Sequence, residues 1–161
     1  MEKVYLLDLN YTLVSNQKET RLLRPFSRRM EHEEYRHDLI HAIKDSRVIM
    51  ITARPNYQCD ESLANVKKKT GWLPDEWYFN DGNYEPPVFK KKALEQYVFP
   101  KHGKNKEKYE YVAIESNPRT RAMYATFGIQ AMPYEKFIKG LNNGTTDEEG
   151  QCDPYYQMEL F

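Results

Sequence analysis

The chain has 161 residues, a length that fits one domain and leaves little room for a second core. Apolar residues make up 40% and charged residues 30% of the sequence, which excludes a largely disordered chain, and no apolar stretch is long enough to cross a bilayer. The formal net charge is zero, but five of the 24 acidic residues lie beyond the last basic residue, so the body of the chain is basic. A basic body is compatible with a phosphorylated partner.

Short apolar runs predict five strands, because each run has the length of a strand and not of a helix. These runs lie at residues 3–7, 47–51, 77–79, 111–114 and 129–131. Helical patterns lie between them at residues 33–45, 90–99 and 118–127. In the first helix Tyr35, Leu39 and Ile43 recur every four residues and form an apolar stripe. Strands that alternate with helices predict an α/β fold with three layers, in which helices cover both faces of a central parallel sheet.

The last part of the chain has a different composition. Asn, Gly, Thr and acidic residues follow Gly140 without apolar periodicity, so we expect one folded domain over residues 1–140 and a flexible acidic tail over residues 141–161. The N-terminus lacks the pattern of a secretory signal, which predicts a cytoplasmic protein. Cys59 and Cys152 are far apart in the sequence and are expected to be free thiols.

Polar side chains follow several of the predicted strands. Asp8 ends the first strand, Thr52 and Arg54 end the second, and Glu115 and Ser116 follow the fourth. Because the carboxyl ends of parallel strands meet at one edge of a sheet, we expect these side chains to lie close together. A carboxylate nucleophile, a hydroxyl donor and a second acidic group at one edge can surround a phosphate group and a divalent cation.

This pattern resembles the four motifs of the haloacid dehalogenase (HAD) superfamily of phosphohydrolases. The matching residues are Asp8, Asn10 and Thr12 for the first motif, Thr52 for the second, Lys90 for the third with Lys91 as the other choice, and Glu115 with Ser116 for the fourth. They occur in the family's order and in the expected strand and helix context over roughly residues 3–138. The resemblance implies a Rossmann-like HAD fold.

The resemblance also implies a mechanism and a cofactor. In the family the first carboxylate attacks phosphorus and forms an aspartyl-phosphate, which water then hydrolyses, and Asp8 would take that role here. Thr52 and Lys90 would stabilise charge on the phosphoryl oxygens, and Arg54 would add a phosphate contact. The implied ligands of Mg²⁺ are Asp8, the backbone carbonyl of Asn10, and Glu115 or Ser116 from the fourth motif.

Two positions depart from the family pattern. Asn10 replaces an Asp that protonates the leaving group and activates water, and an amide can do neither. Loss of a general acid and base lowers a rate by about 10²- to 10⁴-fold. Ser116 stands where a metal-binding carboxylate is usual. The alternatives are a slow phosphatase or a HAD scaffold that binds phosphate or a protein without turnover, and an Asn introduced to trap a substrate would give the same sequence.

Within the superfamily the chain resembles the 3'-phosphatase domain of phage polynucleotide kinase-phosphatases. The likeness rests on Thr52 and Arg54 in "VIMITARPN", on Lys90 in a helix, and on the segment "IESNPRTRAMYATFGI". It implies a nucleic-acid 3'-phosphate end as the substrate. The gaps at residues 13–46 and 55–89 are too short for a large cap domain, which favours a macromolecular end over a small enclosed substrate. Arg21 and Arg24 are the candidates for contacts with its phosphates, and a solvated helix face is the alternative.

The final pentapeptide "QMELF" resembles the sliding-clamp-binding motif of bacteria. Leu160 and Phe161 would supply apolar anchors and Gln157 would supply amide hydrogen bonds, at the end of a tail long enough to reach a partner. The alternative is a tail that folds back on its own core. The peptide therefore predicts a clamp as a partner, and a clamp-tethered HAD scaffold is one form of the non-catalytic alternative.

Overall fold

A computed structural model describes residues 1–143 of the chain. Residues 144–161 of the predicted acidic tail, which include the predicted docking residues Gln157, Leu160 and Phe161, lie outside the described residues. The last described helix, α8 (Tyr134–Asn143), runs past position 140, where the sequence analysis placed the end of the folded domain. Within residues 1–143 no helix combines the length and the apolar character needed to span a membrane.

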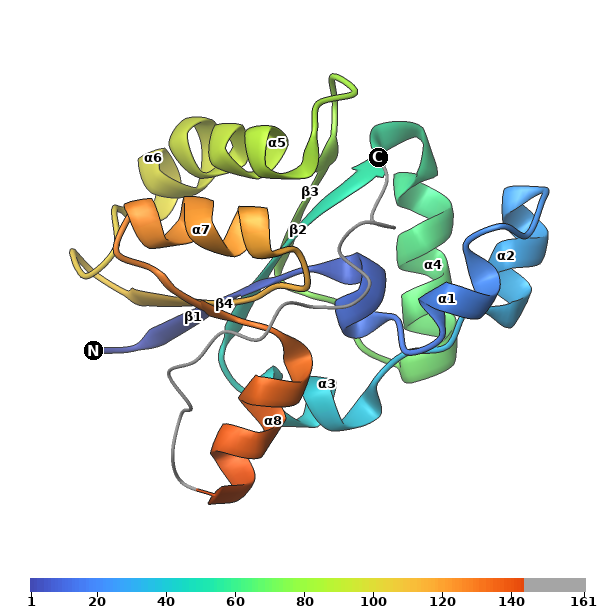
Figure 1. Ribbon diagram of the computed structural model, residues 1–161, viewed down its shortest axis with the longest axis horizontal. Helices are drawn as coiled ribbons and strands as arrows, with labels where there is room; N and C mark the ends of the chain where they lie inside the picture. The colour runs from blue at the N-terminus through green and yellow to red at the C-terminus, as the bar shows by residue number, and fades with distance from the viewer. Residues whose placement is uncertain (144–161) are drawn as a thin grey trace.

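The core of the structure is a parallel sheet of five strands (Figure 1). The strands are β1 (Lys3–Leu7), β2 (Arg47–Pro55), β3 (Glu76–Asn80), β4 (Glu110–Ile114) and β5 (Gln130–Met132). They lie in the order β3-β2-β1-β4-β5, so β1 is central and Leu7 pairs with Met50 on one side and Ile114 on the other. All five predicted strands are therefore present, close to their predicted positions.

Helices cover both faces of the sheet, which confirms the predicted three-layer α/β fold (Figure 1). One face packs against α5 (Pro86–Ala93) with its continuation, and against α7 (Pro118–Thr126), through a core that includes Phe89 and Tyr124. The other face packs against α3 (His37–Ile43), α4 (Cys59–Thr70) and α8 through a core that includes Leu39, Val66 and Phe137. Successive residues of β1 and β4 enter opposite cores, as the alternation of side chains along a strand requires.

The helix boundaries differ from the predicted ones in two places. The helix predicted at 33–45 begins only at His37, because the chain before it is extended and Tyr35 forms an antiparallel bridge with Val14. The helix predicted at 90–99 begins earlier, at Pro86, and continues through η3 (Leu94–Val98) and α6 (Phe99–His102). Proline is well suited to a first helical turn, where its missing N–H has no partner to lose.

A short insert at residues 15–36 separates β1 from α3. It follows η1 (Leu9–Leu13) and carries α1 (Gln17–Thr20) and α2 (Phe26–His32), and it forms no large cap domain, as predicted. Lys69 of α4 donates hydrogen bonds to the carbonyls of Met30 at 3.0 Å and Glu33 at 2.5 Å, and Asn65 donates to that of Met30 at 2.9 Å. The insert is thus fastened to α4.

Candidate active site

Asp8 lies where β1 leaves the sheet, and a tight turn follows it. The amide of Asp8 donates the last sheet hydrogen bond of β1, to the carbonyl of Ile114 at 3.1 Å. Tyr11 then adopts a left-handed conformation with φ of 60°. Arg36 holds the turn by donating to the carbonyls of Tyr11 at 3.2 Å and Thr12 at 2.8 Å. The backbone around Asp8 is therefore fixed from both sides.

The carboxylate of Asp8 is surrounded by donors from three separate segments. Lys90 donates to Oδ1 at 2.8 Å. The hydroxyls of Thr12 and Ser116 donate to Oδ2, each at 2.9 Å, and the amide of Ser116 lies 3.3 Å from the same oxygen. The structure thus brings together residues that are more than 80 positions apart in the sequence.

Lys90 also links Asp8 to Glu115, whose Oε1 accepts from it at 2.6 Å. All three side chains are buried. Burial alone would raise the pKa of Asp8, but the positive charge and hydrogen bond of Lys90 outweigh it and lower that pKa, which keeps Asp8 ionised. Burial and the neighbouring charge of Asp8 raise the pKa of Glu115 to about 8. Glu115 therefore keeps its proton at neutral pH, and further positive charge beside it would favour its ionised form.

The oxygen atoms around Asp8 suit a hard cation such as Mg²⁺. The hydroxyl of Ser116 lies 2.9 Å from Oδ2 of Asp8 and 3.3 Å from the carbonyl oxygen of Asn10, so three of the predicted ligands are neighbours. In residues 1–143 no three His, Cys, Asp or Glu side chains form a metal-binding group. A cation here would depend on the carbonyl of Asn10 and the hydroxyl of Ser116 in addition to carboxylates.

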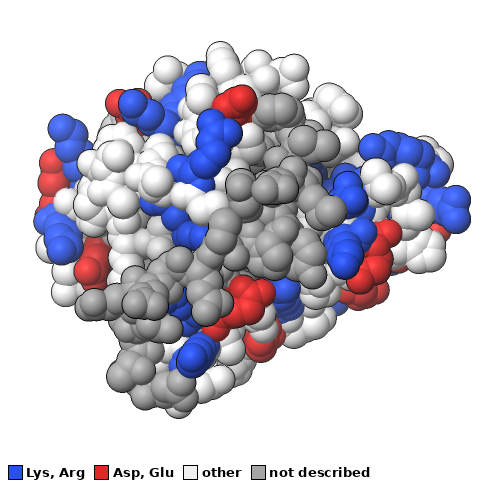
Figure 2. All heavy atoms as spheres, viewed as in Figure 1, with Lys and Arg blue, Asp and Glu red and all other residues white. Residues whose placement is uncertain are grey.

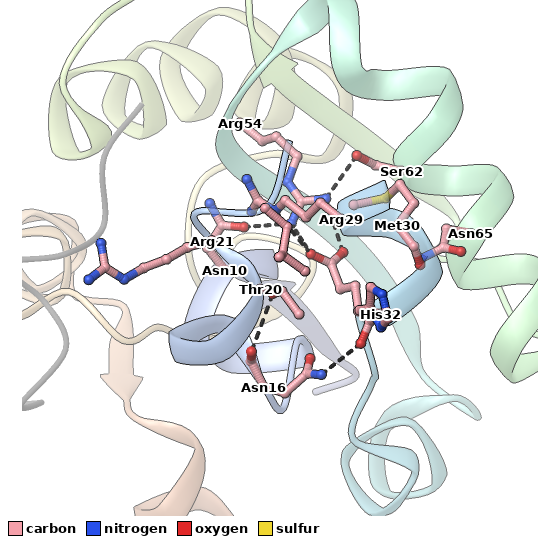
Figure 3. Close-up of polar contacts among 12 residues, drawn as sticks. Asn10, Asn16, Thr20, Arg21, Arg29, Met30, His32, Arg54, Ser62 and Asn65 are labelled. Atoms are coloured by element: carbon pink, nitrogen blue, oxygen red, sulfur yellow. Dashed lines mark hydrogen bonds and ion pairs between the residues drawn. The ribbon is translucent and has the colours of Figure 1, made fainter. Parts of the chain in front are cut away.

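Thr52 and Arg54 come from the end of β2, where the register with β3 shifts. The hydroxyl of Thr52 accepts from the amide of Arg54 at 3.1 Å and is fully buried. Both terminal nitrogens of the Arg54 guanidinium are engaged within the protein. Its nitrogens donate to both oxygens of Glu33 at 3.2 and 3.1 Å, to the hydroxyl of Ser62 at 2.9 Å and to the amide oxygen of Asn10 at 2.7 Å (Figure 3).

Glu33 is the site residue that sequence reasoning missed. Its side chain is fully buried and also accepts from the hydroxyl of Tyr35 at 3.0 Å. Glu33 lies in a segment predicted as helix, and no spacing connects it with the HAD motifs. Only a buried arginine at position 54, which needs an acidic partner, could have signalled that such a residue exists.

Arg21 and Arg24 lie beside the Asp8 cluster and not within it. Both line a cavity of about 380 Å³ that also includes Asn10 and Arg54. Asn10 therefore contacts both the Asp8 cluster and the cavity. Its carbonyl oxygen faces Ser116, and its side chain lines the cavity.

Comparisons with known proteins place the fold. No family model matches the sequence, and no curated protein matches it at the sequence level. Among solved structures, the chain is similar to a chain of a Pnkp1/Rnl/Hen1 complex, with a TM-score of 0.64 and 14% identity over 83% of this chain and 46% of that one. The chain thus spans less than half the length of that relative.

Two other solved structures are similar to this chain over most of their own length. Phosphoserine phosphatase in its apo form has a TM-score of 0.53 and 14% identity over 83% of this chain and 86% of that one. A hydrolase from Streptococcus pneumoniae TIGR4 has a TM-score of 0.56 and 14% identity over 86% of this chain and 97% of that one. At such identity the likeness concerns the fold. The chain shares its α/β fold with these structures, and this is the fold that the resemblance of its motifs to the HAD superfamily predicts.

Proposed function

We propose that this protein hydrolyses phosphate monoesters through an aspartyl-phosphate formed on Asp8. The observation that carries the proposal is the convergence on Asp8 of Lys90 and Ser116, from separate segments, in a buried cluster that keeps the carboxylate ionised. An ionised, rigidly held carboxylate is the state that attacks phosphorus. The HAD-type fold of the chain supports this assignment.

Each residue of the site has a separate role in the proposed reaction. Asp8 attacks phosphorus in line, the bond to the leaving oxygen breaks, and water then hydrolyses the acyl phosphate and frees Asp8. Lys90 and the hydroxyl of Thr52 stabilise negative charge on the phosphoryl oxygens. Mg²⁺ held by Asp8, the carbonyl of Asn10, Glu115 and Ser116 would supply further positive charge when bound.

The substrate class that we favour is a nucleic-acid 3'-phosphate end. The sequence likeness to 3'-phosphatase domains supports it, and so does the small insert, because no part of residues 1–143 forms a large cap over the site. The rival is a HAD scaffold that binds phosphate without turnover, which Asn10 and Ser116 favour. Docking of the C-terminal peptide on a clamp stays a prediction.

Turnover of the protein as it stands separates the two functions. We expect p-nitrophenyl phosphate and a 3'-phosphorylated oligonucleotide to be hydrolysed in Mg²⁺, and addition of EDTA to stop the reaction. Absence of turnover of both substrates in Mg²⁺ would establish the binding scaffold instead. The variants below serve as the matched comparisons.

Asn10→Asp should raise kcat for the oligonucleotide by at least about tenfold, because a carboxylate can take up and release the proton that an amide cannot. The gain should stay below the full range of about 10²- to 10⁴-fold, since Arg54 donates to residue 10 and would hold the new carboxylate ionised. p-Nitrophenyl phosphate should gain less, because its leaving group needs no proton. Steady-state kinetics with both substrates measures this, and an equal gain for both would show that residue 10 does not protonate the leaving group.

Ser116→Asp should raise the affinity for Mg²⁺ by about tenfold, because it adds a carboxylate next to two existing oxygen ligands. Isothermal titration calorimetry measures the affinity without substrate. Ser116→Asn is the matched control, since it has nearly the same shape as Asp but no charge. If Asp and Asn at this position give the same affinity, position 116 does not face the cation.

A further inference from the structure

The cavity beside Asn10 is lined by arginines from two parts of the chain. Arg21, Arg24 and Arg29 come from the insert, and Arg54 comes from the end of β2. Lys and Arg side chains gather over this lobe in the space-filling view (Figure 2), and Figure 3 shows Arg21, Arg29 and Arg54 around Asn10. We call this cavity the arginine pocket. It has a volume of about 380 Å³, and no Asp or Glu lines it.

The arginine pocket has more positive charge than its surroundings neutralise. Arg54 and Arg29 share a single carboxylate, that of Glu33, at 3.1 and 3.5 Å. The ring of Phe26 lies 5.7 Å from the guanidinium carbon of Arg54 and 5.6 Å from that of Arg29, and it offers no charge. Burial and the nearby charge of Arg54 lower the pKa of Arg29 to about 10, which shows that the second guanidinium is held at an energetic cost. An added anion would reduce that cost.

Donors in the pocket are also left without partners. The Nε atoms of Arg21 and Arg54 are buried and make no hydrogen bond to any residue in the part of the chain that the structure describes, and Nε of Arg29 has only the long ion pair with Glu33. Arg54 is only 1% exposed, so its unpaired Nε is a buried donor of a charged group. Buried donors of a charged group that lack acceptors favour a ligand that carries several oxygen acceptors.

Asn10 connects the pocket to the cluster around Asp8. Its amide oxygen accepts from Arg54 at 2.7 Å, so the amide nitrogen, with its two hydrogens, is turned away from Arg54 (Figure 3). A carboxylate at this position would face a guanidinium that Glu33 already neutralises. An amide instead adds a neutral donor to a wall of the pocket, within the turn that follows Asp8.

We propose that the arginine pocket binds a second phosphate group, carried by the same substrate as the phosphate that Asp8 attacks. This rests on the proposed function, because it makes the substrate a compound with two phosphate groups a short distance apart. A guanidinium suits a phosphate because its planar fork can donate to two oxygens at once. A free inorganic phosphate has the same chemistry, and the experiment separates the two sources.

The first arm of the test compares two substrates that share the scissile group. Wild-type protein should have a KM about 10- to 150-fold lower for thymidine 3',5'-bisphosphate than for thymidine 3'-monophosphate, the range expected for charged hydrogen bonds. In the double variant Arg21→Gln, Arg24→Gln the two KM values should become nearly equal. Arg28→Gln is the matched control, because Arg28 is exposed on the same helix as Arg29 and does not line the pocket.

The second arm measures binding without turnover, with thymidine 5'-monophosphate and inorganic phosphate as probes in calorimetry. Thymidine 5'-monophosphate should bind wild type and Asp8→Asn alike, and the double variant at least about tenfold more weakly. If neither substrate is hydrolysed but the binding of thymidine 5'-monophosphate depends on Arg21 and Arg24, the proposed function is wrong and phosphate binding by the pocket is supported. The pocket proposal is overturned if the two substrates have equal KM values in the wild type and if thymidine 5'-monophosphate binds the double variant as tightly as the wild type. Arginine-dependent binding of inorganic phosphate without a bisphosphate preference would overturn its assignment to the substrate.

Discussion

Replacing Asp8 with Asn will lower the turnover of p-nitrophenyl phosphate and of a 3'-phosphorylated oligonucleotide by at least about 10⁴-fold, the scale on which loss of a nucleophile acts. The amide has nearly the same shape as the carboxylate, so it can still accept from Ser116 and Thr12, but it cannot attack phosphorus. Steady-state kinetics gives the rates. Acid-quenched protein should contain labelled phosphate after reaction of the wild type with radiolabelled substrate, and none after reaction of the variant.

Asp45→Asn is the matched control for this experiment. Asp45 is exposed and lies just before β2 begins, at the edge of the sheet opposite to Asp8. Its replacement should leave both the rate and the phosphoenzyme unchanged. Turnover that survives Asp8→Asn would mean that another group is the nucleophile, and the assignment of Asp8 would have to be abandoned.

Replacing Lys90 with Met should lower the free energy of unfolding by about 3–5 kcal/mol at pH 9, because it leaves the buried carboxylates of Asp8 and Glu115 without their shared cation. The loss should be smaller at pH 6, where Glu115 is protonated in both proteins. At pH 9 only the wild type ionises Glu115, whose pKa is about 8, because removal of Lys90 raises that pKa further in the variant. Guanidinium chloride unfolding followed by circular dichroism measures the difference at both pH values.

Lys91→Met separates this effect from a general effect of losing a lysine in α5. Lys91 is exposed, and its replacement should change the stability by less than about 0.5 kcal/mol. It also decides between the two lysines that the third sequence motif offered. Equal losses of stability in the two variants would show that the buried contacts of Lys90 with Asp8 and Glu115 contribute nothing particular.

The sequence predicted the sheet and the cluster at its edge because both follow from local signals. Short apolar runs have few alternatives to strands, and the parallel order forces their carboxyl ends together, which is how Asp8 and Ser116 meet. Four helices of the described residues were missed: the short α1 and α2 of the insert, and the longer α4 and α8. In α4 only Leu63 and Val66 supply a buried apolar stripe beside three consecutive lysines, so its pattern is weak. In α8 the stripe is clear from Tyr134 to Leu141, and the change of composition after Gly140 obscured it.

The polar network beside the cluster could not be predicted in the same way. Glu33, Arg54 and Asn10 come from three segments with no common spacing, and their contacts depend on where the insert packs. The sequence presented Asn10 only as the loss of a carboxylate. The structure adds a reason for the amide, because Arg54 already has an acidic partner in Glu33 and needs only a neutral acceptor from residue 10.

The attachment of the insert to α4 also bears on rates. Lys69 and Asn65 fasten the C-terminal end of α2 through hydrogen bonds to its carbonyls, so contacts within the protein hold this wall of the arginine pocket. A wall that is formed in advance loses little conformational entropy on binding. Association is then limited by diffusion and by the attraction between the arginines and an anion, which salt screens, and the lifetime of the complex sets the differences in affinity among ligands.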